Sequence, residues 1–306
     1  MDVALPILLQ MTGLYLCIAI GFVAARKFEI HGKSVSQILF YFIVPLTFFY
    51  GISKTNMQPQ YLLLPLFVFF IACTLCLAHY SIARRIYSDK SANILGFASG
   101  NGNLGYFGIP VAMLLFEPPI VGIYMMTIIG TMLFESTLGY YITTKGDFST
   151  REAVIKMAKL PMLHGALLGL LMSLFQLSVP SFMEGFFIGI KGAYSTLGMM
   201  VVGIALAGIS SLKLDWKFIS MSFAVKFIAW PLMVGGLILL DSHLLHLFSE
   251  TVHHTTLLIS FMPLAVNSVI FATLLNAEPE KMATAVFLST VFALIYVPLM
   301  ISFFIL

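Results

Sequence analysis

The sequence of 306 residues contains little charge. Aspartate, glutamate, lysine and arginine make up 9% of the chain, hydrophobic residues make up 60%, and the mean hydropathy is +1.01. Soluble domains carry about 25% charged residues because their surfaces face water, so this composition excludes a soluble domain. The chain is predicted to be a polytopic membrane protein.

Short segments of alternating polarity are also missing. A transmembrane β-barrel would show them at roughly ten-residue length, whereas apolar runs here approach the roughly twenty residues of a membrane-spanning helix. The predicted fold class is therefore all-α. The first apolar run, from Val3, follows Asp2 without a basic segment or a small-residue cleavage site. We expect it to be a retained span and not a signal peptide.

Groups that hold metals or carry redox chemistry are scarce. Of the three cysteines, Cys73 and Cys76 form a C-x-x-C motif, but they lie in an apolar run without ligand partners, which indicates packing thiols. Four histidines gather around one predicted outer loop: His243, His246, His253 and His254. We interpret them as a hydrated cluster at the membrane interface, with a metal or pH-sensing site as the alternative. No metal site is predicted.

Catalytic motifs are absent as well. The sequence has no H-E-x-x-H, no nucleophile elbow and no phosphate-binding loop. Gly100, Gly102 and Gly105 match the dinucleotide pattern G-x-G-x-x-G, yet no β-branched strand leads into them and no acidic residue lies about twenty positions on. The chain is predicted not to be an enzyme and to use no cofactor.

Ten apolar segments are long enough to be membrane spans. They cover residues 3–25, 34–52, 61–83, 92–115, 120–144, 161–178, 187–210, 218–240, 252–275 and 281–304. Pro45 and Pro231 predict kinks in the second and eighth spans. The glycines and alanines of the seventh span predict close helix packing.

Lysine and arginine fall almost entirely in alternate loops. These are the loops after the first, third, fifth, seventh and ninth spans, whereas the other loops hold only Lys54. The positive-inside rule then places both termini outside the cytoplasm, in what we expect to be a bacterial inner membrane. The net charge of +3 follows from this topology, so it does not indicate a nucleic-acid partner.

The two halves of the chain resemble each other. A polar connector at 146–160, with a short amphipathic stretch, separates residues 1–145 from 161–306, and each half holds five spans. Because five is odd, the second half would be inverted in the membrane. The segment 97–103 aligns without gaps on 261–267 and pairs Asn103 with Asn267. We therefore predict two inverted five-helix repeats.

Each repeat contains a span that is expected to break near the middle of the membrane. The fourth span holds glycines and asparagines between Ser99 and Gly108, and the ninth holds Pro263. Irregular backbone survives at this depth only against protein or a watery cavity, and broken helices are the usual substrate sites of secondary transporters. The half-helices starting at Leu104 and Leu264 would point two positive N-termini at one volume.

Such an arrangement favours an organic anion, above all a carboxylate. The predicted substrate-binding residues are Asn101, Gly102, Asn103, Gly105, Pro110, Pro263, Asn267 and Ser268. The alternative is that the amides only satisfy backbone groups that the glycines and prolines leave free.

Two charged residues lie inside predicted spans, where charge is costly and marks candidate functional sites. Glu135 and Lys226 each lie about nine residues from the cytoplasmic end of their spans, so an ion pair or a shared vestibule is one interpretation. Alternatively, Glu135 is a proton-coupling carboxylate, and Lys226 extends its methylene stem to the membrane interface.

At this point the residues resemble a known family. The glycine- and asparagine-rich segment followed by Gly108-Ile109-Pro110-Val111-Ala112, together with the segments 263–267 and 285–290, is similar to the auxin efflux carrier family, which includes bacterial malonate and malate carriers. The resemblance covers essentially the whole chain. The chain differs from plant members in lacking their Asn-Pro crossing motif and long hydrophilic loop.

The resemblance implies a fold like that of the bile-acid sodium symporters. Spans one, two, six and seven would form a scaffold, and spans three to five and eight to ten a transport domain with crossing helices four and nine that slides like an elevator. The expected function is secondary transport of a mono- or dicarboxylate such as malate or malonate. A non-transporting ligand sensor and an auxin-like weak-acid efflux carrier are the alternatives. The coupling ion is not identified and is either a proton or sodium. Membrane lipid is the expected surrounding partner. The scaffold spans permit a homodimer.

Overall fold

The computed structural model describes residues 4–28, 30–144, 155, 158–209 and 212–306. Within these ranges every regular element is helical, and the ten expected spans are all occupied by helix. The helices before the connector are α1 (Ala4–Phe28), α2 (Gly32–Ile38) continuing into α3 (Val44–Ser53), η2 (Pro59–Leu63) with α4 (Leu64–Ala83), α5 (Ser91–Ser99), η3 (Leu104–Gly108) with α6 (Ile109–Leu115), and α7 (Pro118–Phe134) with η4 (Glu135–Gly139) and α8 (Tyr140–Thr144).

The remaining helices lie after the connector. They are α10 (Pro161–Leu174), η5 (Ser181–Met183) with α11 (Glu184–Ala207), α12 (Trp216–Ala224) with α13 (Trp230–Leu240) and η7 (Asp241–Leu245), α14 (Glu250–Ser260), α15 (Asn267–Leu274) and α16 (Pro279–Phe304). In the described part of the chain, 7 helices are long and apolar enough to cross a membrane. The all-helical, polytopic membrane fold is thus confirmed. The amphipathic stretch expected in the connector lies largely outside the described residues.

Prolines explain several local features of these helices. Pro118, Pro161 and Pro279 occupy the first turns of their helices, where no amide donor is needed. Three π-helical turns, η1 (Leu39–Ile43), η3 and η6 (Val225–Ala229), each end two residues before a proline, at Pro45, Pro110 and Pro231. A proline donates no hydrogen bond and crowds the carbonyl four residues earlier, so the helix widens there.

One such freed carbonyl has found another donor. Phe227 lies four residues before Pro231, and its carbonyl accepts a hydrogen bond of 3.1 Å from the Tyr296 hydroxyl. The kinks predicted at Pro45 and Pro231 therefore correspond to wide turns in the structure.

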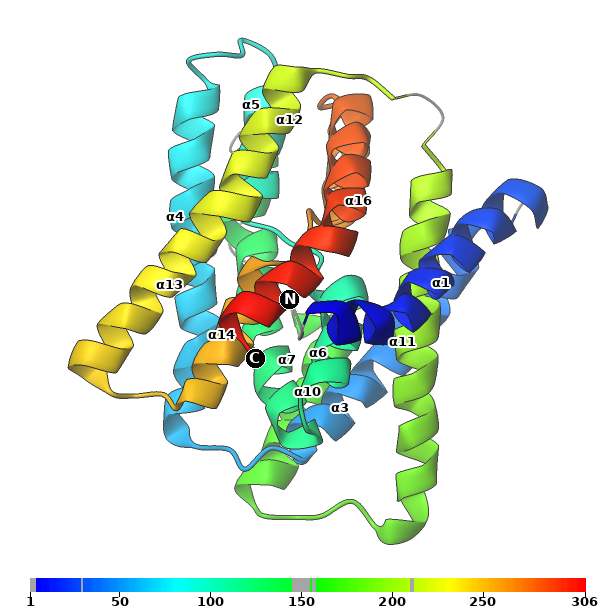
Figure 1. Ribbon diagram of the computed structural model, residues 1–306, viewed down its shortest axis with the longest axis vertical. Helices are drawn as coiled ribbons and strands as arrows, with labels where there is room; N and C mark the ends of the chain where they lie inside the picture. The colour runs from blue at the N-terminus through cyan, green and yellow to red at the C-terminus, as the bar shows by residue number, and fades with distance from the viewer. Residues whose placement is uncertain (1–3, 29, 145–154, 156–157, 210–211) are drawn as a thin grey trace.

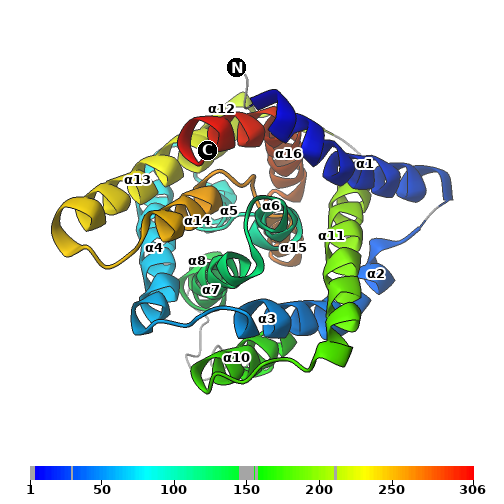
Figure 2. The ribbon, with the colours of Figure 1, turned by 60° about the horizontal axis from the view of Figure 1, so that its bottom comes forward.

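Two pairs of helices line one side of the molecule. α1 lies along α11, and α3 lies along α10 (Figure 2). The interrupted helices occupy the interior, where α5, α6 and α15 lie between these pairs and the outer helices α4, α12, α13 and α16. In Figure 1 the loop between α4 and α5, which carries Arg84 and Arg85, is at the top, and the loop between α10 and α11 is at the bottom.

Glycine permits the close approach of α1 and α11. A Cβ atom on Gly203 would overlap the backbone of Ile18 and Phe22, and one on Gly21 would overlap the backbone of Met200. Lipid tails are as apolar as the helices, so this backbone-to-backbone contact supplies the packing that holds the pair together. The close packing expected from the small residues of the seventh span is present at Gly203.

Replacing Gly203 with alanine should therefore destabilise the protein. Forcing a methyl group against backbone that cannot move should cost about 1–3 kcal/mol. The midpoint of thermal unfolding in detergent micelles measures this loss. Gly189→Ala on the same helix is the matched control, because a Cβ atom there has open space around it. Equal midpoints for the two variants would contradict this packing account.

Candidate functional site

Both predicted breaks are present, at residues 100–103 and 261–266. The first runs from the end of α5 to the start of η3, as expected. The second differs from the expectation, because its second half-helix begins at Asn267 and not at Leu264. The reason is local: Pro263 has no amide proton, and the Leu264 amide donates to the Ser289 hydroxyl at 3.2 Å and not to a helical carbonyl.

The two breaks meet through a backbone hydrogen bond. The Asn103 amide donates to the Pro263 carbonyl at 2.8 Å. The Asn103 side-chain oxygen also accepts from the Phe107 amide at 3.3 Å, which caps the half-helix formed by η3 and α6. Asn103 therefore fixes the start of one half-helix and the contact with the other broken span.

Neighbouring helices supply the remaining partners of the first break. The Trp230 indole N–H donates to the Ser99 carbonyl at 2.7 Å, where α5 ends. The Tyr124 hydroxyl donates to the Leu104 carbonyl at 3.2 Å. At Gly100, a Cβ atom would overlap the ring of Phe134, so only glycine lets the chain pass this close to α7. The sequence did not single out Trp230 or Tyr124; only Pro231, directly after Trp230, pointed to this region.

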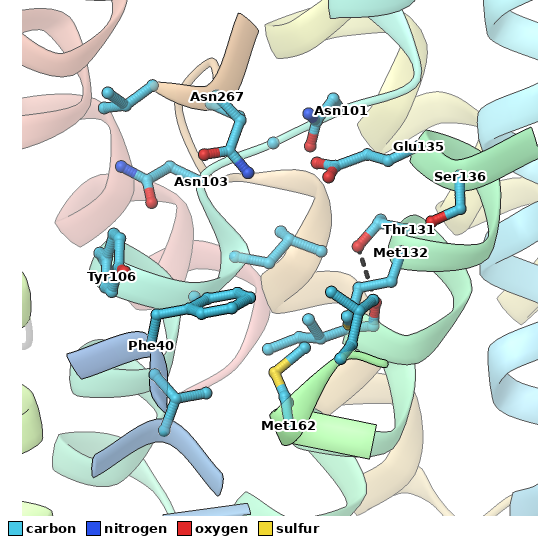
Figure 3. Close-up of a pocket in the computed structure, with 18 of the residues that line it drawn as sticks. Phe40, Asn101, Asn103, Tyr106, Thr131, Met132, Glu135, Ser136, Met162 and Asn267 are labelled. Carbon is cyan, nitrogen blue, oxygen red and sulfur yellow. Dashed lines mark hydrogen bonds between the residues drawn. The ribbon is translucent and has the colours of Figure 1, made fainter. Parts of the chain in front are cut away.

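A cavity of about 510 Å³ lies against the breaks (Figure 3). Its walls include Asn101, Gly102, Asn103, Gly105 and Asn267 among the predicted substrate-binding residues. Pro110, Pro263 and Ser268 are buried and do not line it. Pro110 instead widens η3, and Pro263 accepts the Asn103 hydrogen bond described above.

The polar atoms at the breaks are incompletely satisfied. Among the described residues, four buried side-chain polar atoms have no hydrogen-bond partner, and three belong to predicted site residues: Asn101 Nδ2, Asn103 Nδ2 and Ser268 Oγ. Asn101 is 1% exposed and Asn103 6% exposed. An unpaired buried donor costs about 1–3 kcal/mol, so each needs a partner such as a ligand or water. The interpretation that the amides only satisfy freed backbone groups holds for the Asn103 oxygen and not for its nitrogen.

Glu135 lines the same cavity from η4. Its carboxyl group lies beside the Asn101 and Asn267 amides, and Figure 3 shows the three side chains around one space. Thr131 and Ser136 add hydroxyl groups to the lining, and Phe40, Val44, Met132 and Met162 add apolar side chains. The cavity thus has a polar end at the breaks and an apolar body. The sequence did not predict Phe40, Thr131 or Ser136 as lining residues.

Lys226 does not pair with Glu135. Among the described residues no carboxylate lies within 4.0 Å of its ammonium group, so the predicted ion pair is not formed. Lys226 is 1% exposed, which also contradicts extension to the membrane interface. The ammonium lies 4.6 Å from the centre of the Trp230 ring and packs against Gly102. It therefore approaches the first break from η6, outside the cavity that Glu135 lines.

The other candidate groups have structural partners. His253 Nε2 lies 2.8 Å from a carboxylate oxygen of Asp241, which also accepts from the Leu247 and Phe248 amides. His253 thus joins α14 to the start of η7, and the hydrated-cluster interpretation is wrong for this residue. Among the described residues no three or more His, Cys, Asp or Glu side chains are grouped as a metal site. Cys73 and Cys76 are free thiols inside α4, and Cys76 is fully buried.

Comparison with known proteins identifies the family. A family model described as "Membrane transport protein" matches residues 6–146 and 147–301. The chain belongs to this membrane transport protein family. An uncharacterized transporter of Methanocaldococcus jannaschii is 26% identical over 283 residues, which cover 89% of each chain.

A second relative extends the membrane transport protein comparison to a longer protein. The lysosomal cholesterol signaling protein of Mus musculus is 24% identical over 318 residues, which cover 93% of this chain and 36% of that protein. The chain therefore spans about a third of the length of that relative. Together, the family match and the similar transporter support a transport function for the protein.

The isolated charge at Lys226 leads to a stability prediction. A buried ammonium without a carboxylate partner loses several kcal/mol of hydration, whereas its contact with Trp230 returns about 2 kcal/mol. Lys226→Met should therefore keep or raise the midpoint of thermal unfolding in detergent. Trp230→Phe is the comparison variant, because it removes the hydrogen bond to Ser99 and should lower the midpoint. A large fall for Lys226→Met would show that the ammonium has a stabilising partner.

Proposed function

We propose that the protein is a secondary active transporter that binds a small organic anion at the two breaks. The observation that carries this proposal is the pair of buried, unpartnered donors, Asn101 Nδ2 and Asn103 Nδ2, on the wall of the cavity. A carboxylate supplies acceptor oxygens to both donors. No catalytic group is needed for this role.

Electrostatics at the breaks favour a negative ligand. The half-helix of η3 and α6 and the half-helix α15 begin beside the cavity, and helix N-termini carry about half a positive charge. The Lys226 ammonium, packed against the far side of Gly102, adds a positive charge within reach of the same break. Its role in this proposal is to offset the negative charge of the bound anion through the glycine backbone.

Transport would follow an alternating-access cycle. In this proposal spans one, two, six and seven form the scaffold, and spans three to five and eight to ten, with the crossing helices, form the moving transport domain. The cavity is bordered by Tyr140, Leu160 and Met162, near the loops rich in lysine and arginine. With those loops in the cytoplasm, the structure corresponds to a cytoplasm-facing state.

The shape of the cavity bears on the substrate. Malate and malonate remain candidates, because the Ser136 hydroxyl in the lining offers a donor to a second carboxylate. The apolar body of the cavity favours a second candidate, a weak acid with one carboxylate and an apolar group, as in auxin-like efflux. A carboxylate placed among Phe40, Val44 and Met162 would lose its hydration without replacement.

A ligand sensor on the same fold is the remaining alternative. The similarity to a relative named as a signaling protein favours it, although that relative is much longer than this chain. Counterflow of a radiolabelled carboxylate into preloaded liposomes separates the cases. Saturable exchange supports a carrier, binding without exchange indicates a sensor, and a large flux that does not saturate indicates a channel.

Removing the amides should weaken substrate binding. Asn103→Ala and Asn267→Ala each delete a hydrogen-bonding group facing the anion, and hydrogen bonds to charged groups contribute about 1.5–3 kcal/mol. We therefore expect the KM for carboxylate uptake to rise roughly 10- to 100-fold in each variant. Asn56→Ala, at an exposed asparagine away from the cavity, is the control. Unchanged KM values for both site variants would refute binding at the breaks.

Glu135 is proposed as the proton-coupling group, since it lies beside Asn101 and Asn267 in the cavity. A protonated carboxyl removes the repulsion between Glu135 and the anion, so proton and anion would bind together. Glu135→Gln mimics the protonated form permanently and should flatten the pH dependence of uptake into proteoliposomes. Glu117→Gln is the control, because Glu117 is an exposed glutamate that does not line the cavity. A pH profile in Glu135→Gln identical to that of the unmodified protein would remove Glu135 from coupling.

A further inference from the structure

A second cavity, of about 1030 Å³, adjoins the first. It lies between α2 and α11 on one side and α15 and α16 on the other. Four residues line both cavities: Phe40, Tyr106, Val266 and Asn267. Asn267 is an exposed residue although it begins the half-helix at the break, because it borders both spaces. The second cavity, here called the vestibule, therefore reaches the polar end of the first.

The vestibule opens at the end of the molecule that carries the basic loops. Ile30 and His31, between α1 and α2, border it, and so do Gly32 at the start of α2 and Gly208 and Ile209 after α11. Much of its remaining wall is apolar and comes from α11, α15 and α16. Among the residues that the structure describes, no aspartate or glutamate lines it, and Lys33 forms no ion pair.

Polar groups of the vestibule follow one face of a single helix. Lys33, Ser36, Gln37 and Phe40 are three or four residues apart in α2 and η1, a spacing that places side chains on the same side. Lys33 and Phe40 are about 10 Å apart along the helix axis. The face is cationic at Lys33, on the side of the basic loops. It then carries hydroxyl and amide groups, and it ends in the aromatic ring of Phe40, where the two cavities meet.

We propose that the vestibule is the route by which anions reach the breaks from the side of the basic loops, and that Lys33 attracts them. Ser36 and Gln37 hydrogen-bond the anion between Lys33 and Asn267. Apolar, weakly polarisable walls concentrate the field of a charge that lines a cleft, so one unpaired lysine raises the local anion concentration. The inference rests on the proposed function for its cargo, a small organic anion, but the positive potential itself is measurable without transport.

Charged thiol reagents measure that potential directly. In purified protein with its three native cysteines replaced, Gln37→Cys places a thiol one helical turn from Lys33. A negatively charged methanethiosulfonate should react faster than a positively charged one of similar size. Lys33→Gln should lower the ratio of the two rates about 10-fold, because a charge about 7 Å away changes each rate about 3-fold in opposite directions. Ser36→Cys is a second reporter should Gln37→Cys fold poorly.

Lys27→Gln is the matched control, since Lys27 is an exposed lysine near the same end that lines neither cavity. It should leave the rate ratio within about 2-fold of the parent, given screening over a Debye length. The proposal is overturned if Lys33→Gln leaves the ratio unchanged, or if Lys27→Gln lowers it equally.

Transport provides the second measurement. Lys33→Glu should raise the KM for anions presented on the basic side about 10-fold at low ionic strength, and the effect should shrink at about 1 M salt, where charges are screened. The turnover number and the KM on the opposite side should not change. An equal rise in KM on both sides of the membrane would contradict the proposed route through the vestibule. If the parent protein shows no saturable uptake, the proposed function fails. The ratio of the two reagents' reaction rates still decides whether the electrostatic potential in the vestibule is positive.

Discussion

The hydrogen bond from the Asn103 amide to the Pro263 carbonyl joins the two interrupted spans at the centre of the protein. Backbone groups inside a membrane need partners within the protein, so two breaks at the same depth are stable only if they satisfy each other or find side chains that do. Trp230, Tyr124 and Ser289 supply the remaining partners. With the backbone paired in this way, the asparagine side-chain nitrogens are left free to face the cavity.

This constraint explains the composition of the breaks. Gly100 and Gly102 let the chain pass against Phe134 and the Lys226 ammonium, where any larger residue would collide. The G-x-G-x-x-G pattern therefore reflects close packing at the break and not a phosphate cradle. Pro110 also shapes this region, because it widens the helix directly after the break, although it does not line the cavity.

The sequence contained most of the fold and about half of the site. Apolar length and proline positions predict the ten spans, since helix length and the missing proline donor act locally. Asn101, Asn103 and Asn267 were predictable because polar residues at mid-span are costly. Phe40, Thr131 and Ser136 were not, since an aromatic or hydroxyl residue in a span looks the same whether it faces lipid or a cavity. The contacts of Lys226 with Trp230 and Gly102 were not predictable either, because they depend on how η6 packs against the first break.

The central claim is that an anion binds where the two broken spans meet. A crystal of the protein grown with a bromine-labelled carboxylate tests it most directly, because bromine marks the ligand by anomalous scattering. We expect a peak in the cavity of about 510 Å³, with the carboxylate within hydrogen-bonding distance of Asn103 and Asn267. A peak elsewhere, for example in the cleft bordered by Arg84 and Lys90, would contradict the account.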